Sequence, residues 1–210
     1  MVQKILDYEN GGANFFRDVV LVADDADIAG DFEADADWLA STALAGRTVD
    51  KLYLSQLGAA ATKDAIIQSF DDGASIVSYV GHGSINLWAD ENIFHNKDVP
   101  LLSPQSQQPF VLTMNCLNGF FTLSFFDALA EKLVIAEGRG AIAVFAPSGL
   151  SLNEPAKLFH EAMLEALTSG EHLRLGDAVL AAQEDYAETG AFPELLSIYH
   201  LFGDPALLMR

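Results

Sequence analysis

The sequence predicts an α/β protein with a largely parallel sheet of about six strands and helices on both faces of the sheet. Two apolar runs, residues 75–80 and 109–114, are short and rich in β-branched and aromatic side chains, as in central strands that are buried on both faces. Other strand-like runs alternate with segments of helical periodicity along most of the chain. Right-handed crossovers between parallel strands would place those helices on both faces.

The six expected strands are apolar runs bounded by turn residues. They are residues 19–22, 52–54, 75–80, 109–114, 141–145 and 197–202. The first runs into Asp24 and Asp25, the fifth stops at Pro147, and the last is closed by the Gly203-Asp204-Pro205 turn. We expect the last strand to be antiparallel to its neighbour.

Five helices are expected between the strands. They are residues 32–45, 63–70, 125–137, a helix from Asn153 to just before Gly170, and residues 175–188. The apolar residues of the first fall on one helical face. Thr62, Ser124 and Asn153 are of the types that cap helix N-termini, so they are predicted to start the second, third and fourth helices.

The chain is expected to form one domain, residues 19–210, preceded by an N-terminal arm, residues 1–18, that docks part of its aromatic surface, Phe15 and Phe16. A length of 210 residues suits a single domain with a proper core. The sequence contains no internal repeat, low-complexity tract or linker. Residues 84–108 form a loop that is long for a compact domain, and such loops are often functional.

Charge and cysteine content exclude several classes of function. A formal net charge of −19 argues against binding to nucleic acid or anionic lipid, because both are polyanions. A single cysteine rules out an intrachain disulfide and a multi-cysteine zinc site. No apolar run reaches the ~18 residues of a membrane span, and no signal-peptide core follows Met1. The chain is therefore expected to be cytoplasmic or a domain of a longer exported protein.

Residues with reaction chemistry follow both central strands. His82 follows the strand at 75–80, and Cys116 follows the strand at 109–114. Reactive groups collect where neighbouring parallel strands end, so these two residues could share a cleft although they are 116 − 82 = 34 residues apart. A lone cysteine is most often an inert hydrophobe, and a histidine between glycines can simply occupy a turn. The functional alternative is a thiol nucleophile with a general acid and base.

Four short motifs resemble the gingipain family of caspase-like cysteine peptidases. They are Tyr79-Val-Gly-His-Gly-Ser84, Trp88-Ala-Asp90, Thr113-Met-Asn-Cys116 and Leu201-Phe-Gly-Asp-Pro-Ala206. The similarity extends from about Val19 to the C-terminus. The resemblance implies a three-layer caspase-like fold and a cysteine endopeptidase with the dyad Cys116 and His82. It also implies that the N–H groups of Gly83 and Cys116 form the oxyanion hole. If His82 were inert, His200 would be the alternative histidine.

The resemblance implies further roles around the dyad. Asp24 is expected to orient His82; alternatively, it is a solvated carboxylate or a charge near a helix N-terminus. Trp88 and Asn115 are expected to bind substrate, although an aromatic packed under a loop is the commoner use of a tryptophan. The family suggests cleavage after basic residues, which needs a carboxylate in the pocket, and no residue here can be matched to it.

No metal ligand and no required cofactor are assigned from the sequence, but a structural calcium ion is an open expectation. The acidic segment 24–33 resembles a calcium loop in composition and fails the EF-hand pattern. Relatives bind structural calcium, so the resemblance allows a site there; the alternative is a solvated acidic loop.

Three functions remain open. The expected one is hydrolysis of a peptide or protein substrate by a secreted or cell-surface domain of a longer bacterial protein. One alternative is a sortase-like transpeptidase of a bacterial secretion system. The other is a non-catalytic domain that retains the peptidase fold.

Overall fold

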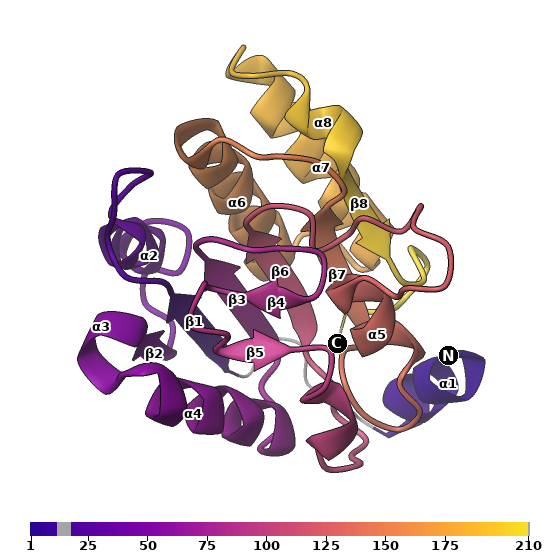
Figure 1. The fold of residues 1–210 in the computed structure, drawn as a ribbon. Helices are drawn as coiled ribbons and strands as arrows, with labels where there is room; N and C mark the ends of the chain where they lie inside the picture. The colour runs from indigo at the N-terminus through magenta and orange to yellow at the C-terminus, as the bar shows by residue number, and fades with distance from the viewer. Residues whose placement is uncertain (12–17, 210) are drawn as a thin grey trace.

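A computed structural model describes residues 1–11 and 18–209 of the chain (Figure 1). Its main sheet has six strands in the order β2-β1-β3-β6-β7-β8. These strands are β1 (Val19–Ala23), β2 (Val49–Tyr53), β3 (Ile76–Val80), β6 (Phe110–Met114), β7 (Ala143–Pro147) and β8 (Tyr199–Phe202). The first five are parallel, and β8 runs antiparallel to β7. The predicted mostly parallel sheet with an antiparallel last strand is confirmed.

Helices cover both faces of this sheet (Figure 1). They are α1 (Val2–Asn10), α2 (Phe32–Ser41), α3 (Leu54–Leu57), α4 (Ala59–Asp71), α5 (Leu129–Ile135), α6 (Asn153–Thr168), α7 (Leu175–Glu188) and α8 (Leu195–Ile198). Helices α2, α6 and α7 pack into one core, and α4 and α5 pack into the other. The arrangement is the three-layer α/β architecture expected from the sequence.

Strand β1 shows why its sequence is a continuous apolar run. Leu21 and Ala23 belong to the core beneath α2, α6 and α7, whereas Val20 and Val22 belong to the core beneath α4 and α5. Successive side chains of a strand point to opposite faces, so a strand covered on both faces is apolar at every position. All five residues of β1 are buried.

The predicted start of α4 is wrong. Helix α4 begins at Ala59, and Gly58, whose φ of 77° favours glycine, is its N-cap residue. Thr62 lies inside the helix, where its hydroxyl donates to the Gly58 carbonyl at 3.0 Å.

The predicted bounds and caps of two other helices are also wrong. Helix α5 is shorter than residues 125–137, and its first free N–H, that of Ala128, donates to the carboxylate of Glu131 at 2.9 Å in place of a Ser124 cap. Asn153 is the first residue of α6, and its amide donates to Asp35 at 2.8 Å instead of capping the helix. The Glu131 contact is a local N-cap to N3 contact at a later start than expected, whereas Asp35 is distant from Asn153 in the sequence.

The long loop at 84–108 contains structure of its own. Strands β4 (Leu87–Trp88) and β5 (Phe94–His95) form an antiparallel hairpin, and a short 3-10 helix, η1 (Val99–Leu101), follows. Trp88 and Phe94 are fully buried in the core beneath α4 and α5, so the hairpin closes that face of the sheet near the ends of β1 and β3.

The N-terminal segment carries α1, which attaches to the body through Lys4. This lysine is buried, and its ammonium donates to the carbonyls of Leu133, Ala136 and Arg139. Phe15 and Phe16, whose docking was expected, lie outside the described residues. The boundary between an arm at 1–18 and a domain at 19–210 stays a prediction. No helix in the described part of the chain is long and apolar enough to cross a membrane.

Candidate active site

The candidate site lies where three adjacent strands end. Strand β3 pairs with β1 on one side and with β6 on the other, and all three run in the same direction. Asp24 follows β1, His82 follows β3 after Gly81, and Cys116 follows β6 after Asn115. The chain leaves β1 for the edge strand β2 and then returns across β1 to β3, so this is a switch point, where ligands bind in open α/β sheets.

Cys116 and His82 line one cavity at this switch point. The Cys116 thiol is partly buried, and its sulfur accepts the Ser151 N–H at 3.4 Å and lies 3.6 Å from the Ser151 carbonyl oxygen. The edge of the His82 ring contacts Phe32, with 5.2 Å between the ring centroids. The two residues predicted from separate strand ends are thus brought together by the fold.

The imidazole of His82 is held by Asp27. Nε2 of His82 lies 2.9 Å from Oδ2 of Asp27, and both side chains are about half exposed. The N–H of Ala29 donates to Oδ1 of Asp27 at 2.7 Å, and this bond, together with the contact to His82, lowers the pKa of Asp27. An ionised Asp27 accepts a hydrogen bond from Nε2–H of His82, which leaves Nδ1 as the ring nitrogen that can exchange a proton with a substrate.

Asp24, which was expected to orient His82, contacts the backbone of this residue and not its ring, because the carboxylate turns inward. Asp24 is buried, and its oxygens accept the backbone N–H groups of His82 and Asp25, both at 3.0 Å. Burial raises the pKa of Asp24 from 3.8 to about 6. The hydroxyl of Tyr79 donates to the His82 carbonyl at 2.6 Å and so holds the next peptide group of the same residue. Asp24 therefore positions the backbone at His82, and Asp27 positions the ring.

Sequence reasoning missed Asp27 because it lies beyond the strand end. Its place beside His82 depends on a turn in which the Asp27 N–H donates to the Gly30 carbonyl at 3.0 Å. An aspartate followed by a glycine three residues later favours such a turn, which was the available signal. The signal fixes the turn and not its position relative to β3.

Two backbone donors near the cysteine are free. Within the described residues, neither the N–H of Gly83 nor the N–H of Cys116 donates a hydrogen bond. A Cβ atom at position 83 would lie 2.3 Å from Nδ2 of Asn115, so only glycine fits here. The expected oxyanion donors are thus present on the two strand-end segments, with Asn115 packed between them.

Trp88 is not a wall of the cavity. It is fully buried, stacked on Tyr79 with 4.7 Å between ring centroids, and its indole N–H donates to Oδ1 of Asn118 at 2.7 Å. The amide of Asn118 donates in turn to the carbonyls of Ser84 and Leu87. The alternative reading, an aromatic packed beneath a loop, is therefore the one that the structure shows. Trp88 and Asn118 join the segment after His82 to the segment after Cys116.

Asn115 does line the cavity, as a buried side chain. Its amide nitrogen donates to Oδ1 of Asn118. Its carbonyl oxygen has no hydrogen-bond partner among the described residues. Buried polar atoms usually have partners, so this oxygen is an acceptor available to a bound molecule.

Three other histidines, His95, His160 and His200, make structural contacts. His160 is buried against the Ser78 hydroxyl at 2.6 Å, and burial lowers its pKa to about 3. Nε2 of His95 lies 2.7 Å from the amide of Asn86. His200, the alternative to His82, lies 2.8 Å from the Ser148 hydroxyl and does not line the cavity with Cys116.

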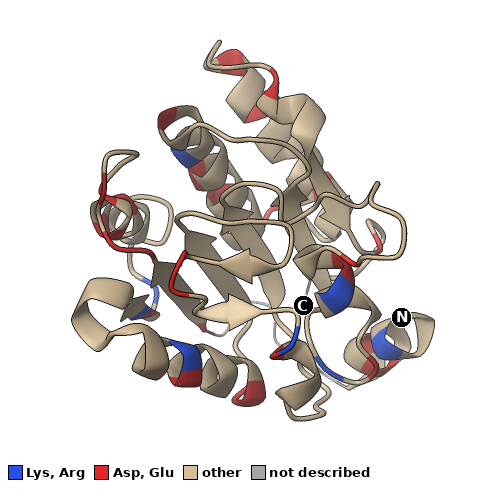
Figure 2. Ribbon diagram, in the orientation of Figure 1, with Lys and Arg blue, Asp and Glu red and all other residues tan. Residues whose placement is uncertain are grey.

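Three carboxylates gather beside the histidine. Oxygens of Asp24, Asp25 and Glu91 lie within 4.8 Å of one another. Figure 2 shows acidic residues in red on the loop from β1 to α2 and on the turn between β4 and β5. Carboxylate oxygens are the donors that hard cations such as calcium prefer, so the residue types suit that ion.

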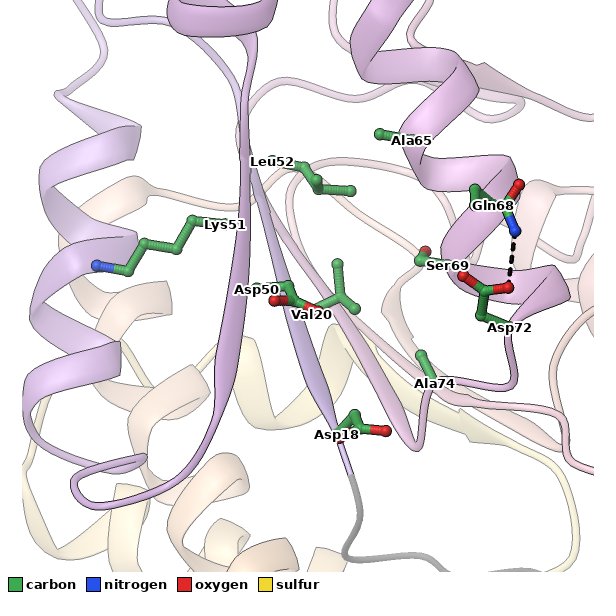
Figure 3. A pocket seen from close by; sticks show the side chains of 10 residues that line it. All are labelled: Asp18, Val20, Asp50, Lys51, Leu52, Ala65, Gln68, Ser69, Asp72 and Ala74. Carbon is green, nitrogen blue, oxygen red and sulfur yellow. Dashed lines mark hydrogen bonds between the residues drawn. The ribbon is translucent and has the colours of Figure 1, made fainter.

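A larger cavity of about 650 Å³ lies elsewhere, between β2 and α4 (Figure 3). Asp18, which precedes β1, lines it, so it lies at the opposite end of that strand from Asp24. Gln68 and Asp72 hydrogen-bond to each other on its α4 side, and Lys51 points away from it. Neither histidine nor cysteine is among its lining residues in the described part of the chain. It is therefore separate from the candidate site.

Comparison with known proteins accounts for this arrangement. The whole chain, residues 1–210, matches the model of peptidase family C25. The chain belongs to this family. Gingipain R2 and gingipain R1, both from Porphyromonas gingivalis, are each 29% identical to this C25 domain over 160 residues. These matches cover 71% of the domain, 21% of the gingipain R2 sequence and 16% of the gingipain R1 sequence.

Solved structures confirm the caspase-like fold of the C25 domain. The crystal structure of the Arg-specific cysteine proteinase gingipain R superposes with a TM-score of 0.82 at 23% identity. A complex of pro- and mature domains of RgpB from Porphyromonas gingivalis gives a TM-score of 0.83, also at 23% identity. The domain is covered completely in both cases but spans 52% and 53% of those chains.

Proposed function

We propose that this C25 domain is a cysteine endopeptidase with Cys116 as nucleophile and His82 as general acid and base. The observation that carries the proposal is the shared cavity of Cys116 and His82, at the ends of adjacent parallel strands and beside two free backbone N–H groups. Thiol nucleophile, base and oxyanion donors are the parts that acyl transfer requires. Family membership supports the same reaction.

The proposed reaction has two steps. Nδ1 of His82 takes the proton of the Cys116 thiol as the sulfur attacks the carbonyl carbon of the scissile bond, and the resulting oxyanion accepts hydrogen bonds from the N–H groups of Gly83 and Cys116. The C–N bond breaks as His82 gives its Nδ1 proton to the leaving amine, which leaves a thioester. Water, deprotonated by His82, then attacks the thioester and releases the acid and the free thiol. Asp27 keeps the ring in the required tautomer throughout.

Cleavage assays with the Cys116→Ala variant test this proposal. Wild-type protein and variant are incubated under reducing conditions with a mixed peptide library, and product masses are recorded. We expect products from the wild type alone, each with a free carboxyl group. A folded wild type that yields no products, and whose thiol does not react with alkylating agents, contradicts the proposal and favours a non-catalytic domain. Products joined to an added amine instead of water identify a transpeptidase.

The context of the domain is a second part of the proposal. We propose that it acts as part of a larger exported protein on peptide or protein substrates at the cell surface or outside the cell. The small share of the curated gingipains that it spans supports this. We also propose that Asp24, Asp25 and Glu91 take a structural calcium ion, because their oxygens converge beside the His82 segment.

A further inference from the structure

The cavity next to the nucleophile is small and mainly apolar. Besides Gly81, His82, Cys116 and three polar residues, it is lined by Ala29, Phe32, Met114, Leu152 and Ala156. They come from the loop before α2, the start of α2, the end of β6 and the start of α6. Its volume is about 50 Å³. At about 10–15 Å³ for each water-sized group, it has room for only a few heavy atoms.

No carboxylate lines this cavity within the described residues. Asp31, which precedes Phe32, caps α2 by accepting the Ala34 N–H at 3.0 Å, and two other carboxylates on the surrounding elements are paired with side chains. Asp27 is bonded to the His82 ring at 2.9 Å. Asp35, in α2, accepts the Asn153 amide at 2.8 Å and the Lys157 ammonium at 3.0 Å. Asn153 therefore separates Asp35 from the cavity, and Lys157 neutralises it.

This cavity is unfavourable for a cationic side chain of a substrate. Arginine recognition requires a carboxylate in bidentate reach, and a buried charge without a partner is strongly disfavoured. A small apolar side chain fills the volume and leaves no group unpaired.

We propose that this cavity receives the side chain that precedes the scissile bond, and that the domain selects small uncharged residues there, such as alanine, serine or valine. The inference rests on the proposed peptidase function. It assigns the cavity to this side chain because the same cavity is lined by the nucleophile and by the general base. This specificity differs from that named for the Arg-specific proteinase gingipain R, and from the basic preference implied by the sequence resemblance.

A matched peptide series tests the proposal. The peptides differ only in the residue before a single cleavage site, which is glycine, alanine, serine, valine, leucine, lysine or arginine. Both product masses are recorded for the wild type and for Cys116→Ala. We expect kcat/KM after alanine or valine to exceed that after arginine or lysine by about 100-fold, the range that a tight pocket achieves.

Two positions permit the specificity to be changed without touching the reacting groups. Ala29 is exposed and lines the cavity, so Ala29→Asp supplies a carboxylate where burial does not oppose it. We expect Ala29→Asp to raise cleavage after arginine by at least ~10-fold, and the uncharged control Ala29→Asn to leave it low. Leu152 is 56% exposed, and Leu152→Ala should widen the cavity and raise cleavage after leucine.

The outcomes separate this inference from the function on which it rests. Preferred cleavage after arginine or lysine by the wild type overturns the inference and leaves the peptidase function standing. Equal responses of Ala29→Asp and Ala29→Asn also contradict the assignment of this cavity. If no peptide is cleaved and no peptidyl chloromethyl ketone alkylates Cys116, the proposed function fails and the inference fails with it.

Discussion

Replacement of Asp24 by asparagine should change how stability depends on pH. The pKa of Asp24 is about 6 in the folded protein against its ordinary 3.8, because the carboxylate is buried. Between these two pH values the folded state holds a proton that the unfolded state has lost. The contribution to stability is therefore complete below pH ~3.8 and is lost as the pH rises through ~6.

The magnitude follows from the pKa difference. About one pKa unit of the window lies above pH 5, and one unit corresponds to about 1.4 kcal/mol. Solvent near the strand end screens part of this, so we expect about 1 kcal/mol. The wild type should lose this amount relative to Asp24→Asn between pH 5.0 and 7.5, because the variant has no carboxylate to ionise.

Urea titrations of both proteins at both pH values measure this effect, with EDTA present to remove metal ions from the neighbouring carboxylates. Taking the difference between the proteins at each pH cancels every titration that they share. Replacement also weakens a hydrogen bond to the His82 N–H. This bond favours the ionised carboxyl group, and its pH dependence is already contained in the pKa of Asp24. A difference that stays constant within about 0.3 kcal/mol would refute the argument that burial controls the Asp24 carboxylate.

Three further predictions concern the groups around the dyad. Asp27→Asn should lower kcat/KM about 10-fold and leave the melting temperature unchanged, since the exposed carboxylate supports the His82 ring and not the core. A pH–rate profile with the same height and shape as that of the wild type would contradict this role. Gly83→Ala should reduce kcat by about 10²-fold while Cys116 still reacts with iodoacetamide. The reason is that the new Cβ would lie 2.3 Å from the Asn115 amide and displace an oxyanion donor. A near-normal kcat would exclude Gly83 from that role. Millimolar calcium should raise the melting temperature by about 2–4 °C, and Glu91→Gln should reduce this gain; no shift in the wild type would argue against a calcium site.

The parts of the site that the sequence could predict are those fixed by the sheet. His82 and Cys116 each follow a run of apolar residues long enough to be a buried strand, and parallel strands place such positions at one edge. The register between β3 and β6 pairs Val80 with Met114, so the two segments leave the sheet side by side. The positions of His82 and Cys116 could therefore be predicted from the strand pattern and from the short motifs at the strand ends.

The parts that the sequence could not predict depend on loop paths and distant partners. Asp27 contacts His82 only because the loop after β1 folds back over the end of β3. The burial of Trp88 depends on a hairpin that packs against Tyr79 and on a hydrogen bond to Asn118, thirty residues away. Periodicity and capping rules describe residues within one element, so neither contact has a local signal.

The dyad and the oxyanion donors are held by two separate sets of contacts. On the β1 side, Asp24 fixes the backbone at His82 and Asp27 fixes its ring. On the β6 side, Asn118 joins the segment after Cys116 to the segment after His82 through the Ser84 carbonyl. A change at Asp27 should therefore affect proton transfer, whereas a change at Asn118 should affect the spacing of the two N–H donors. Separate effects on the pH profile and on kcat are what this division of contacts requires.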